Sequence, residues 1–319
     1  MSVIVVGLGS IGIRHAEIFG QLGIEVETGV DPDPDRRRAF EVHLGGVGVD
    51  CLDEALTSGP SLAIIASPNR FHIEQAIRSA EAGCHLLIEK PLGTELKGAV
   101  RLAEVVESLG LFAHVGSNFK FHTALIRMKE LLEQKSIGRV TGVQVLAGQW
   151  LPGWHPHEDY RQGYSARADL GGGIALDTHE LDCLTWLLGP VEELASFATR
   201  SGSLEVDTED VACACLRFSN GILGTVHVDY IQRDYRRRYH ISGDEGTIEW
   251  DFGTGLLTVY SAETGEARVE NVHEELNEMY VRQARHVLAG VAGNEDPVTP
   301  IRQAISVLDL QLRVRASYA

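Results

Sequence analysis

The chain opens with a short apolar strand that runs directly into a glycine-rich turn. Residues 2–6 are mostly β-branched, which is typical of a buried parallel strand. The turn that follows reads Gly7-Leu8-Gly9-Ser10-Ile11-Gly12. Gly7 permits the tight turn, Gly9 lets a phosphate approach the main chain, and Gly12 lets the next helix pack against the sheet. This junction predicts an open α/β sheet with an anion site at its edge.

An acid at the end of the second expected strand narrows the class of ligand that this turn can bind. Residues 25–30 read as that strand, and Asp31 closes it 19 positions after Gly12. The spacing is close to the roughly 20 residues at which a carboxylate binds the adenosine ribose of a dinucleotide. Ser10 and Ile11 would offer main-chain N–H groups to the pyrophosphate. A glycine-rich turn in another kind of α/β protein is the alternative.

The same acid predicts which dinucleotide binds. A carboxylate at position 31 accepts hydrogen bonds from a ribose diol and repels a 2′-phosphate, so we expect NAD rather than NADP. The nearby basic residues Arg36–Arg38 begin at least one turn into the following helix, and for that reason we give them no role here.

Length and charge limit the class of protein. The 319 residues suit two domains, and a hydrophobic content of 44% can build two full cores. A formal net charge of −17 disfavours nucleic acid or an anionic membrane as partner. No apolar stretch approaches the roughly 20 residues of a membrane span, and the apolar start lacks the basic flank of a signal peptide.

The five cysteines include no CxxC pair, so we expect free thiols, the reducing cytoplasm and no metal site. Cys213 and Cys215 fall on one face of an expected strand, and we predict that both are buried.

The first third of the chain alternates strands with helices, which predicts a doubly wound parallel sheet. Ligands bind at the carboxyl ends of strands in such sheets, so the loops after the strands should share one edge. These loops are the glycine turn, Ser67-Pro68-Asn69, Glu89-Lys90-Pro91 and Gly116-Ser117-Asn118.

Beyond about residue 120 the pattern changes to consecutive strands, which predicts a mainly antiparallel sheet. The expected strands are residues 140–148, 192–199, 210–218, 223–232, 236–243, 246–251 and 256–261. Helices are expected at residues 123–134 and 274–292 and from residue 301 onward. We therefore divide the chain into residues 1–118 and residues 119–319, with the C-terminal helix free to pack back on the first domain.

Two residues stand out as candidates for proton chemistry. Pro91 restricts the backbone before it, so the Lys90 side chain should be well placed to polarise a substrate oxygen. His179 follows the run Gly171-Gly172-Gly173, and an imidazole titrates near neutral pH, which suits reversible proton transfer. A solvated lysine and a histidine with a purely structural role are the alternatives. Asp177 and Glu180 also fit a capping box at the start of a helix.

These motifs resemble the glucose–fructose oxidoreductase / inositol dehydrogenase / MocA family over essentially the whole chain. The resemblance rests on the glycine turn, Asp31, Ser67-Pro68-Asn69-Arg70-Phe71-His72, Glu89-Lys90-Pro91, Gly116-Ser117-Asn118-Phe119-Lys120-Phe121 and the helix after the glycine run. It implies an N-terminal Rossmann domain and a C-terminal α+β domain whose open sheet makes a homodimer or homotetramer. It also implies cofactor contacts from Ser67, Pro68, Asn69, His72, Glu89, Lys90 and Asn118.

The resemblance further implies oxidation of a sugar or cyclitol hydroxyl, or the reverse ketone reduction, with Lys90 and His179 at the reacting oxygen. In the family an aspartate usually lies four residues before the histidine. Here Asp177 lies only two residues before it, which would point the two side chains apart on a regular helix. Either a helix begins between the two residues, or Asp177 is only a cap and Asp182 could orient His179 instead.

The substrate side is expected in the aromatic-rich stretch of residues 149–167. Aromatic rings stack on sugar faces, and charged groups bind hydroxyls or an anionic substituent. We predict substrate contacts from Trp154, His155, Tyr160, Arg161 and Tyr164 in addition to Lys90 and His179. An aromatic core loop is the alternative.

The family branch that this stretch resembles favours a nucleotide-activated or acidic sugar. A basic cluster at Arg233 and residues 236–238 would be an anion site or a solvated strand face.

The expected activity is thus NAD-dependent hydride transfer to or from a sugar carbon. Two alternatives remain open: an enzyme that recycles a bound NAD while cleaving or eliminating a glycoside, and a non-catalytic dinucleotide-binding regulator.

Overall fold

The computed structural model describes residues 1–154 and 159–318, and the chain forms two compact units. Unit 1 contains Met1–Asn118 and Tyr280–Leu308, and unit 2 contains Phe119–Met279 and Asp309–Ala319. The two helices near the C-terminus, α9 (Leu276–Val291) and α10 (Ile301–Arg315), each cross a boundary between the units.

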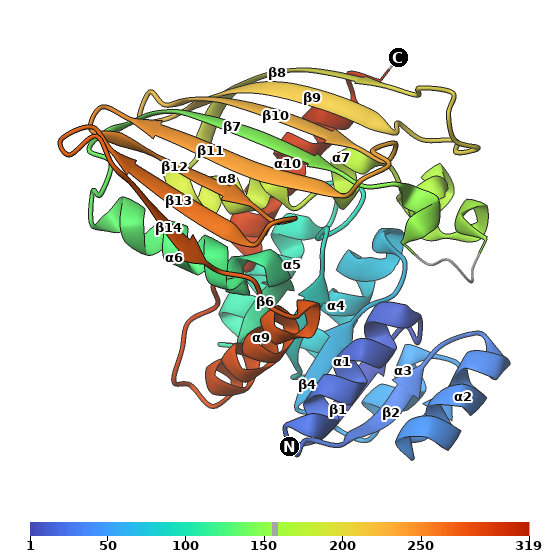
Figure 1. Cartoon of the computed structure of the whole chain (residues 1–319). Coiled ribbons are helices and arrows are strands. Elements are labelled where there is room, and N and C mark those ends of the chain that lie inside the picture. Colours follow the sequence, from blue (N-terminus) through green and yellow to red (C-terminus); the bar gives the residue numbers. More distant parts are fainter. Residues whose placement is uncertain (155–158, 319) are drawn as a thin grey trace. The chain divides into compact units, whose positions relative to one another are not determined.

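Unit 1 is built on a parallel six-stranded sheet with the order β3-β2-β1-β4-β5-β6 (Figure 1). Its central strands are buried along their whole length, as their unbroken apolar runs require. The strand order reverses between β1 and β4, where open α/β sheets bind ligands. The strands are β1 (Val3–Val6), β2 (Val26–Val30), β3 (Val47–Val49), β4 (Leu62–Ile65), β5 (His85–Glu89) and β6 (Ala113–Gly116).

The helices of unit 1 begin and end at residues that suit those positions. In α2, for example, Asp33 accepts a hydrogen bond from the N–H of Asp35 (2.9 Å), Pro34 takes the first helical position, and Gly45 ends the helix with φ 77°. The other helices are α1 (Ser10–Gln21), α3 (Leu52–Leu56), α4 (His72–Glu81) and α5 (Ala99–Ser108), with a 3₁₀ turn η1 (Asn69–Phe71).

Unit 2 is built on an eight-stranded sheet with the order β14-β13-β12-β11-β7-β10-β9-β8. All neighbouring strands are antiparallel except β7 and β10, so the predicted mainly antiparallel sheet is confirmed. The strands are β7 (Val140–Gly148), β8 (Val191–Thr199), β9 (Val211–Phe218), β10 (Leu223–Asp229), β11 (Arg236–Gly243), β12 (Gly246–Asp251), β13 (Leu256–Ser261) and β14 (Ala267–Asn271).

Helices α6 (Thr123–Glu133), α7 (Ile174–Asp177) and α8 (Glu180–Leu188) lie on one face of this sheet (Figure 1). Unit 2 also contains 3₁₀ turns η3 (Leu151–Gly153), η4 (Tyr160–Gln162), η5 (Tyr164–Ala166) and η6 (Ala168–Leu170), and η2 (Asn118–Phe121) lies at its start.

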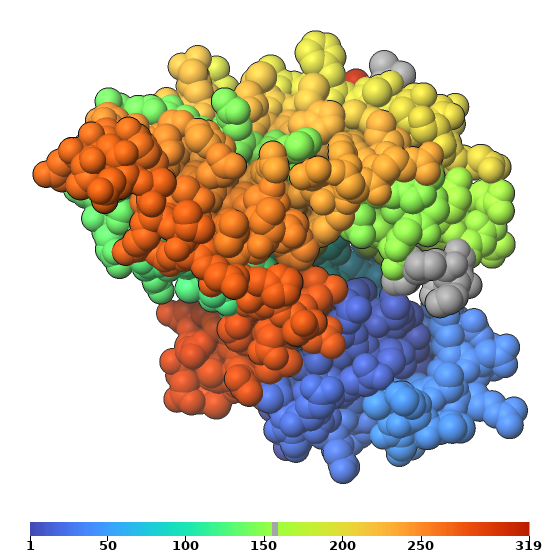
Figure 2. All heavy atoms as spheres, viewed as in Figure 1, coloured from blue at the N-terminus to red at the C-terminus, as the bar shows by residue number. Residues whose placement is uncertain are grey.

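The prediction that Cys213 and Cys215 are buried is wrong, because both lie on the opposite face of the sheet. Ala212, Ala214 and Leu216 of β9 point to the helices and are buried, whereas Cys213 and Cys215 alternate with them and are exposed. The two cysteines do share a face, but it is the face without helices. In Figure 2 the yellow and orange strand segments of the sheet reach the surface directly. No helix in the described part of the chain is long and apolar enough to cross a membrane.

Candidate active site

The glycine turn of unit 1 has the geometry expected for a phosphate cradle. Gly7 has φ 96°, and a Cβ on Gly12 would lie 1.8 Å from the Gly7 carbonyl oxygen. A Cβ on Gly9 would meet only Arg36 Nη1, at 3.9 Å, so the space in front of Gly9 is open. Gly9 is also the N-cap of α1, and its glycine leaves the first N–H groups without a side-chain cap.

Asp31 is buried at the end of β2 and is joined to the turn. One carboxylate oxygen accepts the N–H of Leu8 and the other accepts the N–H of Asp33, both at 2.9 Å. The arginines on α2 were expected to lie too far along the helix to matter at Asp31. Arg36 Nη1, however, lies 3.6 Å from the Asp31 carboxylate. A helical residue several positions along can fold its long side chain back to the strand end, which spacing along the chain does not reveal.

His72 connects two of the strand-end loops. Its Nδ1 lies 2.8 Å from the Pro91 carbonyl and its Nε2 lies 2.7 Å from the Ser67 carbonyl. Burial lowers the pKa of His72, although both carbonyls and the charge of Glu89 oppose the shift. The ring therefore holds the loops after β4 and β5 together, and the cofactor contact expected of His72 stays a prediction.

Glu89 and Lys90 lie at the carboxyl end of β5, and Glu89 is tied to the helix of the glycine turn. Its Oε1 lies 2.7 Å from Nε2 of the buried His15 on α1, and its Oε2 accepts the N–H of Lys90 at 3.2 Å. Burial raises the pKa of Glu89, but the hydrogen bond and charge of His15 outweigh this effect and bring it below its ordinary value. Sequence reasoning missed His15; its position one turn after Gly12, on the buried side of α1, was the available signal.

Asn69 and Asn118 are buried at the ends of the loops after β4 and β6. Unit 1 therefore brings together the predicted cofactor residues Gly7, Gly9, Ser10, Ile11, Gly12, Asp31, Ser67, Pro68, Asn69, His72, Glu89, Lys90 and Asn118, all at the carboxyl side of the sheet or at the start of α1.

In unit 2 the predicted capping box is wrong, because the helix is interrupted. Asp177 is the last residue of α7, Thr178 is extended (ψ 145°), and His179 is the N-cap of α8. The Asp177 carboxylate instead accepts three hydroxyl groups: Tyr164 at 2.8 Å, Ser165 at 2.6 Å and Tyr230 at 2.7 Å. This local break also removes the regular-helix spacing from which Asp177 was expected to point away from His179.

Asp182 has a partner of its own. Its carboxylate lies 2.6 Å from Nζ of the buried Lys120, on the first turn of unit 2. Burial raises the pKa of Asp182, and Lys120 partly offsets that rise. A carboxylate already engaged by a buried ammonium group is a poor candidate for orienting His179.

His179 itself is held by the main chain and by a neighbouring ring. Its N–H donates to Glu180 Oε2 at 3.0 Å, its carbonyl accepts the N–H of Cys183, and its ring lies 4.8 Å from that of Phe119. The imidazole therefore sits at the start of α8 rather than within a helix.

The predicted substrate residues divide into two groups. Trp154 packs edge-on against Tyr230 and Tyr164 binds Asp177, which places both beside the glycine-run segment. Tyr160 and Arg161 are tied to the loop at Glu205, whose N–H donates to the Tyr160 hydroxyl and whose carboxylate lies 3.2 Å from Arg161. His155 lies outside the described residues.

The arginine cluster is not one anion site. Arg236 pairs with Asp234, Arg237 with Glu180 and Arg238 with Asp251. Arg233 differs, because its guanidinium carbon lies 3.5 Å from the centre of the Trp150 ring.

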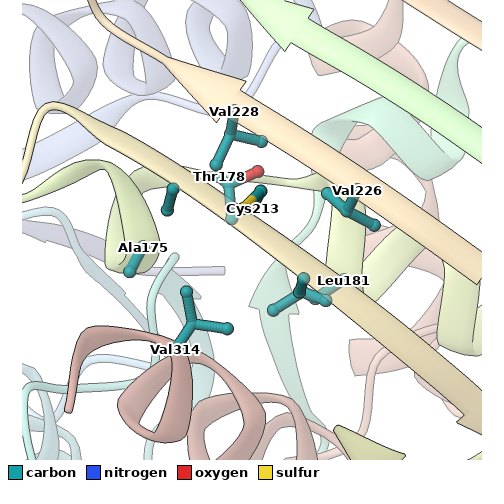
Figure 3. A pocket seen from close by; sticks show the side chains of 9 residues that line it. Ala175, Thr178, Leu181, Cys213, Val226, Val228 and Val314 are labelled. Carbon is teal, nitrogen blue, oxygen red and sulfur yellow. The ribbon is translucent and has the colours of Figure 1, made fainter. Parts of the chain in front are cut away.

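A small cavity under α7 and α8 is lined by apolar side chains from α7, α8, β9, β10 and the end of α10 (Figure 3). Its volume of about 10 Å³ is roughly that of one water molecule, so it is a packing gap and cannot hold a sugar.

A parallel sheet with a glycine-rich turn after its first strand and an acid after its second is the arrangement of a dinucleotide-binding fold. The chain belongs to the GFO/IDH/MocA family: residues 1–117 match the oxidoreductase family with an NAD-binding Rossmann fold, and residues 125–249 match the GFO/IDH/MocA C-terminal domain. The protein is thus an NAD-binding oxidoreductase, as the sequence predicted.

Named relatives and solved structures cover nearly the whole chain. Myo-inositol 2-dehydrogenase of Thermotoga maritima is 27% identical over 100% of this chain and 95% of its own. Levoglucosan dehydrogenase in complex with NADH and levoglucosan has a similar fold, with a TM-score of 0.89 and 18% identity over 99% of this chain and 96% of that one. The WlbA dehydrogenase of Bordetella pertussis, in complex with NADH and UDP-GlcNAcA, gives a TM-score of 0.82 and 23% identity over 99% and 95%.

Proposed function

We propose that this protein is an NAD-dependent dehydrogenase or reductase that acts on a carbinol or ketone carbon of a sugar. The observation that carries the proposal is the position of Lys90 at the carboxyl end of β5, directly beside Glu89, which ties this strand end to the cofactor-binding helix α1. A lysine so placed can polarise a substrate oxygen at the cofactor edge.

The residues present fit NAD. Gly9 leaves an open space that any Cβ would reduce, and Asp31 lies where the adenosine ribose would be bound. When bound, NAD supplies the hydride acceptor, and its reduced form supplies the hydride. The α1 N-terminus would hold the pyrophosphate, and Asp31 would accept the ribose hydroxyls.

Within this proposal Lys90 and His179 divide the work at the substrate oxygen. His179 takes the hydroxyl proton as general base in the oxidation direction, and Lys90 stabilises the developing alkoxide. Asp177 fixes the segment before His179 through its three hydroxyl partners.

We further propose that the sugar is anionic, either acidic itself or activated by a nucleotide. Within the described residues Arg233 has no carboxylate partner, and its guanidinium is stacked on Trp150 at the end of β7. A guanidinium held in this way keeps its N–H groups available for a carboxylate or phosphate. Trp154, Tyr160, Arg161 and Tyr164 from the same segment would complete the substrate contacts, with His155 as a sequence-based candidate.

The proposed assembly is a homodimer or homotetramer through the exposed face of the eight-stranded sheet. Phe197 is 77% exposed there, and the strand pairing places it in one row with Cys213 and His227. We place the protein in the cytoplasm, where its free thiols would stay reduced. Sedimentation velocity of the purified chain, with Phe197→Glu as the interface variant, tests the assembly.

The test of the activity is NADH formation across a panel of neutral, acidic and nucleotide-activated sugars. Wild-type protein should accumulate NADH with at least one anionic sugar, and His179→Asn should lower kcat by roughly 10²-fold. A sugar converted without net NADH would instead support an NAD-recycling enzyme. NAD binding with no turnover of any sugar would support a regulator.

A further inference from the structure

Arg237 is a buried cation on the helix-covered face of β11. It is only 8% exposed, whereas its neighbours Arg236 and Arg238 reach solvent and pair with Asp234 and with Asp251. Removing a guanidinium from water is costly unless an anion compensates it. Arg237 has no part in the proposed proton transfer, so another role must account for its burial.

The compensating anion is Glu180, which also binds the main chain of His179. Glu180 is 1% exposed, and its Oε1 lies 2.8 Å from Nε of Arg237. Its other oxygen, Oε2, accepts the N–H of His179 at 3.0 Å and the hydroxyl of Thr178. One carboxylate therefore joins the buried cation to the backbone of the proposed catalytic residue.

A second line of contact reaches the imidazole ring. The guanidinium carbon of Arg237 lies 3.8 Å from the centre of the Phe119 ring, which is the distance range of a cation–π contact. The Phe119 ring in turn lies 4.8 Å from the ring of His179, tilted by 53°. Arg237, Phe119 and His179 thus pack in series.

The local backbone explains why such support is needed. The break at Thr178 separates α7 from α8, so His179 stands at an N-cap position outside the regular turns of either helix. Within the described residues, the N–H of His179 is satisfied by a side chain instead of by a helical carbonyl. Side chains from η2 and β11, Phe119 and Arg237, pack beside this position.

We propose that Arg237 is a positioning residue that holds His179 through Glu180 on the main-chain side and through Phe119 on the ring side. The inference rests on the proposed role of His179. Burial lowers the pKa of Arg237, but the charge of Glu180, with smaller contributions from Tyr235, Tyr239 and Cys183, raises it above its ordinary value, so the cation persists at every working pH.

The experiment compares Arg237→Gln with Arg238→Gln, its matched neighbour on the exposed face of the same strand, using the sugar that gives NADH. Arg237→Gln should lower kcat by about 10- to 100-fold, because a misplacement of about 1 Å costs that much. The KM for NAD should change by less than about twofold, since the glycine cradle belongs to unit 1. Arg237→Lys should recover part of kcat, and Arg238→Gln should stay within about twofold of wild type.

If Arg237→Gln does not fold, Phe119→Leu still tests the proposal, because it removes the ring contact and leaves the pair of Arg237 with Glu180 in place. It should lower kcat by about fivefold or more and leave the KM for NAD unchanged. A fall in melting temperature with normal kcat for the folded variants would mean that Arg237 is only structural, and the inference would be overturned. If His179→Asn retains full turnover, the proposed function fails instead, so the two failures are distinguishable.

Discussion

The two units hold their predicted functional residues by different physical means. In unit 1 the glycine turn offers main-chain atoms, namely the N–H groups at the start of α1 and the bare Cα of Gly9. In unit 2 the key groups are side chains that other side chains hold, as with Asp177 and its three hydroxyl partners. A site made of main-chain atoms tolerates most side-chain substitutions but is lost when a glycine is replaced. A site made of side chains is lost when one of the side chains that hold it is replaced.

The largest expected effect is at Gly12. A Cβ there would lie 1.8 Å from the Gly7 carbonyl oxygen, and backbone cannot move aside as a flexible side chain can. Gly12→Ala should therefore destabilise unit 1 by about 3 kcal/mol or more and abolish NAD binding. Thermal melts and NAD titration by intrinsic fluorescence measure both effects.

Gly9→Ala is the matched control, because its φ of −72° suits any residue and its Cβ would meet only Arg36, at 3.9 Å. This variant should fold like wild type yet bind NAD at least about tenfold more weakly, since the methyl group occupies the space of the phosphate. Equal NAD affinity for Gly9→Ala and wild type would show that the glycine turn does not bind the phosphates of NAD.

The next effect is at Asp177 in unit 2. Asp177→Asn replaces one acceptor oxygen with a donor among three buried hydroxyl groups and should cost about 2 kcal/mol of stability. The exposed Asp169, paired with Arg167 at the surface, provides the control; Asp169→Asn should change stability by less than about 0.5 kcal/mol. Similar melting temperatures for the two variants would contradict the contrast between the units.

What could be predicted from the sequence follows the same division. The glycine turn, Asp31 and Lys90 lie at strand ends as expected, because strand periodicity and glycine spacing report main-chain geometry. The strands β7, β11, β12 and β13 were predicted at their observed bounds. The short strand β14 at the edge was missed, because its alternation of apolar and polar residues covers only five positions.

The side-chain partners were not predictable in that way. Phe119, Glu180 and Arg237 come from three separate segments, and only the folded register of β11 brings Arg237 to the helix-covered face. The spacing of Asp177 and His179 allowed a helix to begin between them, and the break between α7 and α8 lies there. The face of β9 that is buried was misjudged for Cys213 and Cys215, because alternation assigns two faces without saying which one meets the core.

A smaller effect concerns cofactor choice, where unit 1 does use side chains. Asp31→Ser removes the group that excludes a 2′-phosphate and leaves Arg36, now 3.6 Å from that carboxylate, to bind it. The ratio of kcat/KM for NAD to that for NADP should fall about tenfold, which is 1.4 kcal/mol. Measured with both cofactors, an unchanged ratio would refute the role of Asp31.

The double variant Asp31→Ser/Arg36→Gln separates the two residues. If Arg36 supplies the phosphate contact, the double variant should lose activity with NADP relative to Asp31→Ser while keeping the same weak activity with NAD. If the double and single variants match with NADP, the correction that the structure makes to the role of Arg36 has no functional consequence.

The smallest effect tests the side-chain pairs of unit 2 through pH. The Arg127 guanidinium donates to Glu270 at 2.8 Å and holds the pKa of this carboxyl below its ordinary value of 4.5. A carboxyl whose pKa is lower in the folded state adds stability above the unfolded pKa and loses it as pH falls through the folded pKa. Glu270→Gln should therefore cost about 0.5 kcal/mol at pH 7, and this cost should shrink as the pH falls below 4.5.

Urea melts at pH 7, 5, 4 and 3 measure this difference, with Glu266→Gln as the control. Glu266 lies beside the same edge strand, is exposed, and has no ion pair within the described residues. Its replacement should leave stability unchanged at every pH, so only the curve for Glu270→Gln should converge on wild type at low pH. A constant offset between these two curves would mean that Glu270 stabilises unit 2 by packing rather than by charge, and the pairing of α6 with β14 would then not depend on ionisation.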